Sequence, residues 1–455
     1  MNWVCDDNVA LLTDLYELTM AASYFSRGRN GEATFDLFAR DLPAHRNFLV
    51  ACGLDEALGY LQDLSFDDDA IDYLRSLGLF EEEFLTYLAG LTFTGEVRAI
   101  AEGEVVFPGE PLLSVTAPII EAQIVETFLL NCISFQTTIA SKAARIALAC
   151  NGRPFMDMSP RRDHGADAAL KAARAAYIGG ASGTSNVLAG KVYGLAVQGT
   201  MAHSYVMAFD SEIEAFRNFC LDFPTSTVLL IDTFDVEEGA RRAVRVAREL
   251  APQGVVLRGV RIDSGRLAPL ARSVRKILDE GGLEDVRIVL SGDLDEYRIQ
   301  TLLNEAVPVD AFGVGTQLGT SADAPALGCV YKLVAEEGRP RIKLSAGKAT
   351  TPARKQLYRF SSGDCYERDL VTGEEEDVTG GRPLLECVME GGRRKGAPPP
   401  LADARRRCEK ALARLPARLR TLEGEVEPYR VDLSEHLEDL VRAMRARGGD
   451  GAAAV

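Results

Sequence analysis

The sequence is poor in the residues that usually build metal sites and disulfide frameworks. It has four histidines, well separated along the chain, and nine scattered cysteines, none of which form a CxxC pair. Zinc knuckles and disulfide scaffolds normally show closely spaced cysteines. We therefore expect neither, and we expect reduced thiols in a cytoplasmic protein.

Long apolar runs are also missing. The uninterrupted apolar runs are short, as at residues 228–231, whereas a membrane helix needs about 20 apolar residues. The first residues show neither the basic nor the apolar region of a signal peptide. We expect no membrane segment and no secretion.

The chain lacks a basic surplus, since 67 acidic residues face 51 basic ones and the net charge is −16. A nucleic-acid binder needs a basic face, so nucleic acid is excluded as a partner, and an anionic membrane is disfavoured too. Residues 1–150 hold 23 acidic and 8 basic residues, while the remainder holds 44 and 43. The cations of a site for an anionic substrate are therefore expected mainly after residue 150.

A repeating pattern fills the middle of the chain. Short apolar runs end in small polar clusters, and helical patterns such as 166–177 and 267–280 lie between them. The runs are 154–159, 195–204, 228–235, 259–265, 287–295 and 311–316. Repeated strand–loop–helix units predict a parallel sheet, either open or closed into a barrel. The absence of GxGxxG weakens a dinucleotide-binding interpretation.

The flanking regions have a different pattern. We expect helices at 11–25 and 125–149 and strands at 32–38 and 96–100. We expect a hairpin within 365–377 and helices near 401–421 and 434–447. This gives an N-terminal α/β domain (1–149), a parallel α/β domain with the active site (150–335) and a C-terminal part (336–455).

Polar residues stand at nearly every predicted strand end, where chemistry sits in parallel α/β folds. They are Asp157, His203, Asp232, Asp263, Asp293 and Thr316. Arg161 and Arg162 follow the first run and suit a bidentate grip on carboxylate or phosphate, although a solvated pair at a helix start explains them equally well. Asp232 and Asp263 suit Mg²⁺ or sugar hydroxyls, but Asp263 could also simply cap the following helix.

His203 lies among small residues in GTMAHS and suits proton transfer or phosphoryl acceptance. A hydrogen-bonded core histidine is the alternative. Glycines and hydroxyls in FGVGTQLGTS (312–321) predict a nest of backbone N–H groups for a phosphate, although no Walker A motif is present. A cationic run, Lys343, Lys348, Arg354, Lys355 and Arg359, predicts either a solvated face or a lid over polyphosphate.

Taken together, ordered segments along the chain resemble the nicotinate phosphoribosyltransferase family. They include LLTDLYELTM (11–20), RRDHGADAALKAARAAYIGG (161–180), YGLAVQGTMAHS (193–204), GVRIDSG (259–265) and FGVGTQLGTS (312–321). The resemblance implies a type II phosphoribosyltransferase: an N-terminal α/β domain, an irregular α/β barrel and a small C-terminal region. It also implies a homodimer with shared active sites.

The resemblance further implies that nicotinate and 5-phosphoribosyl-1-diphosphate give nicotinate mononucleotide and diphosphate in NAD biosynthesis. Mg²⁺ is the implied cofactor, and ATP is the implied co-substrate, hydrolysed through a phosphohistidine at His203. The implied substrate-binding residues are Tyr16 (from the partner subunit, stacked on the pyridine ring), Arg161, Asn186, Thr200, Asp232, Arg261, Gly315, Thr316, Lys343 and Lys348. Arg261 and Asp263 join His203 in the catalytic set.

Two positions bear on the substrate. Met158 stands where relatives carry an aromatic residue, so it would supply only an apolar wall for the ring. Asn186 stands where the nicotinamide-using relative has aspartate, which favours an acid over an amide. Nicotinamide phosphoribosyltransferase, quinolinate phosphoribosyltransferase and an inactive metabolite-binding homologue remain the alternatives.

Overall fold

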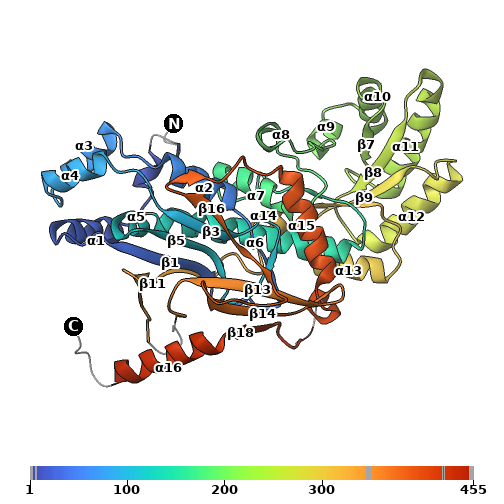
Figure 1. Cartoon of the computed structure of the whole chain (residues 1–455). Coiled ribbons are helices and arrows are strands. Elements are labelled where there is room, and N and C mark those ends of the chain that lie inside the picture. Colours follow the sequence, from blue (N-terminus) through green and yellow to red (C-terminus); the bar gives the residue numbers. More distant parts are fainter. Residues whose placement is uncertain (1–3, 6–7, 345–349, 423, 425, 450–455) are drawn as a thin grey trace. The chain divides into compact units, whose positions relative to one another are not determined.

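The chain forms two compact units in a computed structural model that describes residues 4–5, 8–344, 350–422, 424 and 426–449. Unit 1 combines residues 1–138 with 326–455, and unit 2 comprises residues 139–325. Figure 1 shows the chain coloured along its sequence. Unit 1 thus joins the two ends of the chain, whereas the predicted division into three parts follows chain order and stays a prediction.

Unit 1 contains a seven-stranded sheet of order β12-β11-β1-β5-β3-β16-β17. Its strand β1 (Glu32–Ala39) pairs antiparallel with β5 (Pro111–Pro118) and β11 (Cys329–Glu336). The ring of Phe35 on β1 stacks on Tyr331 at 4.9 Å, and both are buried. The strands predicted at 32–38 and 96–100 are confirmed, the latter as β3 (Glu96–Ile100).

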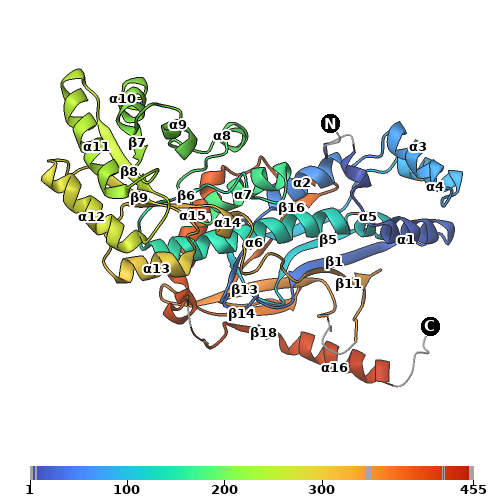
Figure 2. The same cartoon turned by 180° about the vertical axis from the view of Figure 1, so that it is seen from behind.

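Two smaller sheets and several helices complete unit 1. One sheet has the order β15-β13-β14-β18, and β2 pairs with β4. Helix α5 contacts both β1 and β5, and α1 packs on α5, as Figure 2 shows from behind. The bounds are β2 (Leu49–Val50), β4 (Val105–Val106), β12 (Arg339–Pro340), β13 (Lys355–Ser362), β14 (Cys365–Gly373), β15 (Arg382–Pro383), β16 (Leu385–Glu390), β17 (Arg393–Arg394), β18 (Arg430–Leu433), α1 (Leu15–Ser26), α2 (Leu54–Asp63), α3 (Asp68–Ser76), α4 (Glu82–Ala89), α5 (Ile119–Ile124), α15 (Leu401–Arg414) and α16 (Glu435–Gly449), with 3₁₀ turns η1 (Val9–Leu11) and η3 (Ala417–Arg420). Helix α6 (Glu126–Cys150) begins in unit 1 and ends in unit 2.

Two C-terminal expectations need correction. Residues 365–373 form one strand, β14, and the hairpin joins it to β13, because Gly363 adopts a left-handed conformation (φ 58°) at the turn. The helix expected over 401–421 ends at Arg414, because Pro416 disfavours the helical conformation of Leu415, which is extended.

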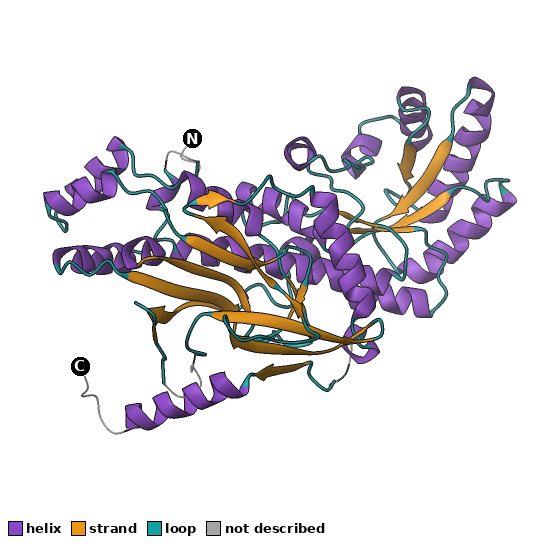
Figure 3. Ribbon diagram, in the orientation of Figure 1, coloured by secondary structure: helices purple, strands orange, loops and turns teal. Residues whose placement is uncertain are grey.

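Unit 2 is built on a parallel sheet of order β6-β10-β9-β8-β7. Figure 3 shows helices around its strands. The strands are β6 (Phe155–Asp157), β7 (Thr227–Leu230), β8 (Leu257–Ile262), β9 (Arg287–Leu290) and β10 (Ala311–Val314). The helices are α7 (Ala166–Ile178), α8 (Val187–Tyr193), α9 (His203–Met207), α10 (Glu212–Asp222), α11 (Val236–Leu250), α12 (Leu267–Glu280), α13 (Glu296–Asn304) and α14 (Thr316–Gly319), with the 3₁₀ turn η2 (Ala251–Gln253).

Burial explains why these strands read as continuous apolar runs. The inner residues Ile288, Leu290, Phe312 and Val314 are fully buried, as expected for a parallel sheet covered by helices on both faces. Helix α12 presents Leu267, Ala271, Val274 and Leu278 to the core at helical spacing. The chain therefore has the predicted mixed α/β fold with a parallel sheet.

One predicted strand is wrong. The run 195–204 contributes only an isolated bridge, Val197 with Thr184, and Thr184 in turn bridges Asp157 at the end of β6. Gly194 is left-handed (φ 68°) just before the run, and residues 203–207 form α9. Among the described residues, the regular sheet runs from β7 to β6, and only these two single bridges extend it beyond β6.

Candidate active site

A cavity of about 620 Å³ opens where the strands of the unit 2 sheet end. The residues that line it come from several segments of unit 2. They are Met158, Arg161 and Arg162 after β6, Ser185, residues 199–204, Arg261 and Asp263 at the end of β8, residues 291–293 after β9, and Gly313, Gly315 and Thr316 at β10. Segments that are far apart in sequence thus meet at one place. Asp263, Asp293 and Thr316 follow strand ends and line the cavity together, as expected. Arg261 on β8 and His203 line it as well, although the run before His203 is not a strand.

Arg261 gives the cavity an available cation. Its Nη1 donates a hydrogen bond to Thr200 Oγ1 at 2.7 Å, while its Nε is buried and has no partner within the described residues. Burial lowers the pKa of Arg261, and the carboxylates of Asp263 and Asp232 oppose that shift. A guanidinium stays charged under any ordinary condition, so Arg261 places at the cavity wall a positive charge that forms no ion pair with a carboxylate among the described residues.

Asp232 shapes the loop that follows β8. Its Oδ2 accepts hydrogen bonds from the backbone N–H of Asp263 at 3.0 Å and from Ser264 Oγ at 2.7 Å. Asp263 in turn accepts a hydrogen bond from Ser291 Oγ at 2.5 Å. Asp263 lines the cavity whereas Asp232 does not. Asp232 therefore supports the position of Asp263 from outside the cavity.

His203 begins the short helix α9 at the cavity wall. Its Nδ1 lies 3.1 Å from Thr233 Oγ1, and Nε2 is the ring nitrogen left for another partner. Thr233 follows Asp232 in the IDTFD motif, so the sequence contained this residue, but nothing in the pattern linked it to His203. A histidine oriented through one nitrogen is suited to accept a phosphoryl group through the other.

The end of β10 is a glycine-containing turn that packs closely against the residues after β6. Gly315 caps α14 with φ −110° and ψ −108°. A Cβ on Gly313 would lie 2.5 Å from Met158 Sδ, and one on Gly319 would lie 1.8 Å from Asp163 Oδ1. The glycines of this motif therefore allow close packing beside Thr316. Met158 lines the cavity as an apolar side chain, as anticipated.

A buried acid network holds the turn that carries the arginine pair. Asp157 accepts hydrogen bonds from the backbone of Ser159 and from Thr184 Oγ1, and Ser159 Oγ donates to Asp163 at 3.0 Å. Burial raises the pKa of Asp163 to about 6. Arg161 and Arg162 are exposed on this turn, and within the described chain neither has an ion-pair partner.

The remaining predicted residues lie elsewhere. Asn186 is the N-cap of α8: its side chain accepts a hydrogen bond from Ala189 N and donates one to Ala169 O, and its neighbour Ser185 is the residue that lines the cavity. Tyr16 and Lys343 belong to unit 1, and Lys348 lies outside the described residues. Tyr16 is 47% exposed on α1.

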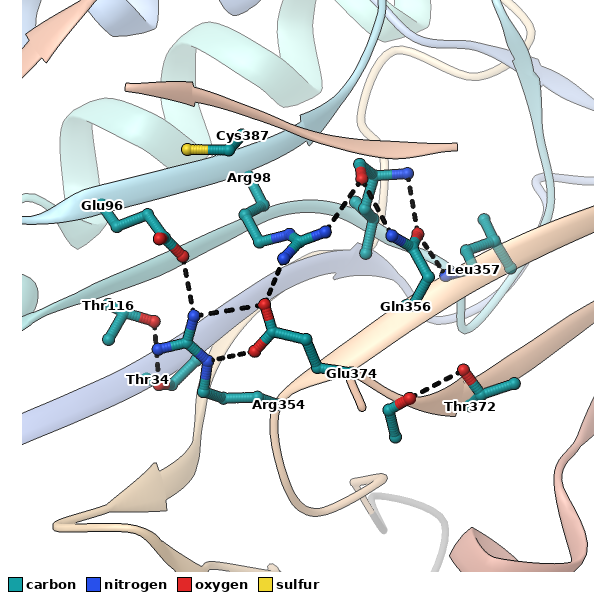
Figure 4. Close-up of polar contacts among 12 residues, drawn as sticks. Thr34, Glu96, Arg98, Thr116, Arg354, Gln356, Leu357, Thr372, Glu374 and Cys387 are labelled. Carbon is teal, nitrogen blue, oxygen red and sulfur yellow. Dashed lines mark hydrogen bonds and ion pairs between the residues drawn. The ribbon is translucent and has the colours of Figure 1, made fainter. Parts of the chain in front are cut away.

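The cationic run after Lys343 is neither a solvated face nor a polyphosphate lid at its last three positions. Arg354 forms ion pairs with Glu96 at 2.7 Å and Glu374 at 2.5 Å, and Figure 4 shows it between these two carboxylates. Lys355 is buried against Asp36 at 2.7 Å. Arg359 is buried as well. Glu96 and Asp36 come from strands that are distant in sequence, so these two ion pairs could not be predicted from the sequence alone.

Several cavity residues escaped the sequence-based site prediction. Ser185 and Ser291 are two of them. Ser291 lies inside the run 287–295 but was not singled out, whereas Arg162 had been named together with Arg161. Within the described residues, no group of three or more His, Cys, Asp or Glu side chains is arranged to hold a metal ion. No helix there combines the length and apolar character needed to cross a membrane.

The parallel α/β sheet, with arginines, hydroxyls, a histidine and a glycine-rich turn at its strand ends, defines an enzyme that handles anionic, phosphorylated substrates. Comparisons with known proteins identify the family within this class of enzymes. Sequence models match residues 11–134 (nicotinate phosphoribosyltransferase N-terminal domain), 154–354 (nicotinate phosphoribosyltransferase family) and 377–441 (nicotinate phosphoribosyltransferase C-terminal domain). The chain belongs to the nicotinate phosphoribosyltransferase family, a family of NAD-biosynthetic enzymes.

Individual relatives agree with this assignment. The chain is 47% identical over 429 residues to nicotinate phosphoribosyltransferase pncB2 of Mycobacterium tuberculosis, covering 94% of this chain and 92% of the relative. It is 41% identical over 383 residues to nicotinate phosphoribosyltransferase of Bacillus subtilis, covering 82% and 78%. The crystal structure of human nicotinic acid phosphoribosyltransferase superposes with a TM-score of 0.86 at 30% identity, covering 95% of this chain and 99% of that one.

Proposed function

We propose that the chain transfers the phosphoribosyl group of 5-phosphoribosyl-1-diphosphate to nicotinate, giving nicotinate mononucleotide and diphosphate. The observation that carries this proposal is the cavity itself, which gathers Arg161, Thr200, His203, Arg261 and Thr316 from segments that are far apart in sequence. Its volume of about 620 Å³ falls in the range of small-molecule sites.

In this proposal different residues of the cavity bind different parts of the two substrates. Arg261, held by Thr200, binds the nicotinate carboxylate through its unpaired N–H groups. Met158 supplies an apolar contact for the pyridine ring. The Gly315–Thr316 turn and Arg161 bind the phosphates. Because Asn186 adds no negative charge near Ser185, nothing there repels an acid substrate.

The reaction needs charge stabilisation more than proton transfer. The bond between the ribose C1 and the diphosphate oxygen breaks, and its electron pair leaves with diphosphate. The pyridine nitrogen then donates its free lone pair to C1, so no general base is required. Asp263, fixed by Ser291 and by Asp232, lies where it can stabilise the positive ribosyl centre or hold its hydroxyls.

Mg²⁺ fits this site as a companion of the substrate. It favours one or two carboxylates together with substrate phosphates, and Asp263 and Asp293 are the carboxylates in the cavity lining. When bound, it would neutralise charge on the departing diphosphate.

We further propose that ATP hydrolysis is coupled to the reaction through His203. The γ-phosphoryl group passes to Nε2 with release of ADP, and water later takes it as phosphate. The bond to Thr233 would hold Nδ1 and keep Nε2 available. We also propose that the sheet closes as an irregular barrel, since the bridges at Thr184 and Val197 extend its β6 edge beyond the regular strands.

The active enzyme in this proposal is a homodimer with shared sites, in which Tyr16 of a second copy stacks on the pyridine ring. The large exposed fraction of Tyr16 supports such a role. Mixing inactive Tyr16→Ala and His203→Ala chains should restore activity through one intact mixed site. Failure to complement, while each homodimer stays folded, would contradict sharing.

The direct test of function is product analysis. The purified chain with 5-phosphoribosyl-1-diphosphate, Mg²⁺ and ATP should form the mononucleotide from nicotinate, at least about 100-fold faster than from nicotinamide. ATP should leave an acid-labile, base-stable phosphate, absent in His203→Ala. Equal use of the amide would overturn the substrate assignment, and ATP stimulation that survives His203→Ala would overturn the phosphohistidine.

A further inference from the structure

A second cavity, of about 750 Å³, lies wholly within unit 1 and shares no residue with the active-site cavity. One face of α15 forms a large part of its wall, with Arg406, Arg407, Lys410 and Arg414. Arg406, Lys410 and Arg414 follow one another at four-residue steps, and Arg407 lies three residues before Lys410, so the helix presents them on neighbouring positions of one side. Arg382 joins them from β15.

The charges of this cavity do not cancel, because its lining holds five cations but only three carboxylates, those of Glu104, Asp364 and Asp403. Arg382 pairs with Glu104 at 2.8 Å, and Arg406 pairs with Asp403. Arg407 donates to the backbone oxygen of Glu102, which carries no formal charge. Within the described part of the chain, Arg407, Lys410 and Arg414 have no ion pair with a carboxylate.

Ring and hydrogen-bond contacts hold the side chain of Arg414 in place in this cavity. Arg414 lies over the ring of Tyr366 at 4.9 Å, and the buried Arg359 lies over the same ring at 4.7 Å. Arg414 also donates hydrogen bonds to Asp364 O at 3.3 Å and Ser361 Oγ at 3.2 Å. The guanidinium of Arg414 is therefore oriented in advance, which reduces the entropy cost of binding an anion.

Clustered cations repel one another, and in a chain of net charge −16 such a cluster creates a local field that attracts anions. Three unpaired cations in a cavity large enough for a small molecule match an anion of several charges rather than a single carboxylate. We propose that this cavity, which we call the α15 site, binds a small molecule that bears a di- or triphosphate group. Such a ligand could be a nucleoside polyphosphate or an inorganic one.

The test is calorimetric titration of inorganic triphosphate into the full chain that carries Arg161→Gln and Arg261→Gln, which weaken the active-site cavity. One binding event per chain should remain. Adding Lys410→Glu, at an exposed position, should raise its Kd about tenfold or more. The matched control Arg420→Glu, an exposed arginine of unit 1 outside the cavity, should change it less than about twofold.

Loss of all binding in the Arg161→Gln/Arg261→Gln chain would overturn the proposal, and so would equal weakening by Lys410→Glu and Arg420→Glu. Should Lys410→Glu fail to fold, Lys410→Gln gives the same comparison with a smaller expected shift. ATP binding more tightly than triphosphate would identify a nucleotide ligand, whereas equal affinity would identify the phosphate chain alone. The outcome does not depend on whether the chain makes nicotinate mononucleotide.

Discussion

The buried cations of the unit 1 sheets and the strand-end cations of unit 2 use the same side chains for opposite purposes. Arg359 in unit 1 is 2% exposed and forms ion pairs with Asp369 at 2.6 Å and Glu104 at 3.0 Å. Arg261 in unit 2 contacts a neutral hydroxyl and keeps a buried N–H group unpaired. A cation whose partners are already in the protein supports the fold, and one that lacks them is available to a substrate.

The unit 1 cluster around Arg359 also contains a fully buried carboxyl group, Glu110. Burial, together with the nearby carboxylate of Asp369, holds the pKa of Glu110 well above its ordinary value. The Asp369 carboxylate is further bound by Tyr429 OH at 3.0 Å. Each group of this cluster therefore depends on the others, and removing one leaves an unbalanced charge.

The largest effect should come from breaking that cluster. Arg359→Met leaves Asp369 and Glu104 without their shared cation, so we expect a loss of about 3–5 kcal/mol in the free energy of unfolding. Urea unfolding followed by circular dichroism measures it. A loss below about 1 kcal/mol would mean that Arg359 is not the structural centre described above.

The opposite result is expected for unit 2. Arg261→Gln removes the charge but keeps a polar side chain, so kcat/KM for nicotinate should fall about 100-fold. The free energy of unfolding should change by less than about 1 kcal/mol, because no ion pair is lost. A variant that unfolds easily but retains activity would reverse the roles assigned to the two regions.

A pH effect distinguishes the regions further. Burial raises the pKa of Glu17 in unit 1 to about 7, although Thr127 Oγ1 donates a hydrogen bond to it. The folded chain therefore holds this proton over the window from about pH 4.5 to 7, in which the unfolded chain releases it. The free energy of unfolding should fall as pH rises through that window, by about 2 kcal/mol in all.

The Glu17→Gln variant mimics the protonated acid and should flatten this part of the stability profile. Thermal unfolding at several pH values between 4.5 and 7.5 provides the measurement. An unchanged profile would show that Glu17 is ionised in the folded chain.

The smallest effect concerns the support of Arg261. Thr200→Val removes the hydrogen bond that Thr200 Oγ1 accepts from the charged Arg261 guanidinium, worth about 1.5 kcal/mol, so the KM for nicotinate should rise about tenfold. A conservative Thr200→Ser should restore most of the affinity, because the hydroxyl returns. No rescue by serine would mean that the methyl group of Thr200 matters instead.

The sequence was most informative where structure repeats locally. The parallel strands could be placed because apolar runs and strand-end polar clusters alternate, and Arg261, Asp263 and Thr316 could be assigned because strand ends converge in such folds. The run 195–204 was the exception, since it contributes only a single bridge at Val197 and its last two residues already belong to α9.

Long-range partners were the part that the sequence could not provide. Arg354, Lys355 and Arg359 resemble substrate-binding cations in a linear reading, yet their carboxylate partners, Glu96 and Asp36 among them, lie far away along the chain. Thr233 and Ser291 were missed for the same reason, because their importance comes from contacts to His203 and Asp263 across neighbouring strands.

The most direct test of the central assignment is a crystal structure of the chain with nicotinate mononucleotide. The proposal predicts the pyridine carboxylate on Arg261 near Thr200, and the phosphate at the Gly315–Thr316 turn. A nucleotide bound elsewhere, with Arg261 left free, would contradict the assignment of the strand-end cavity as the active site.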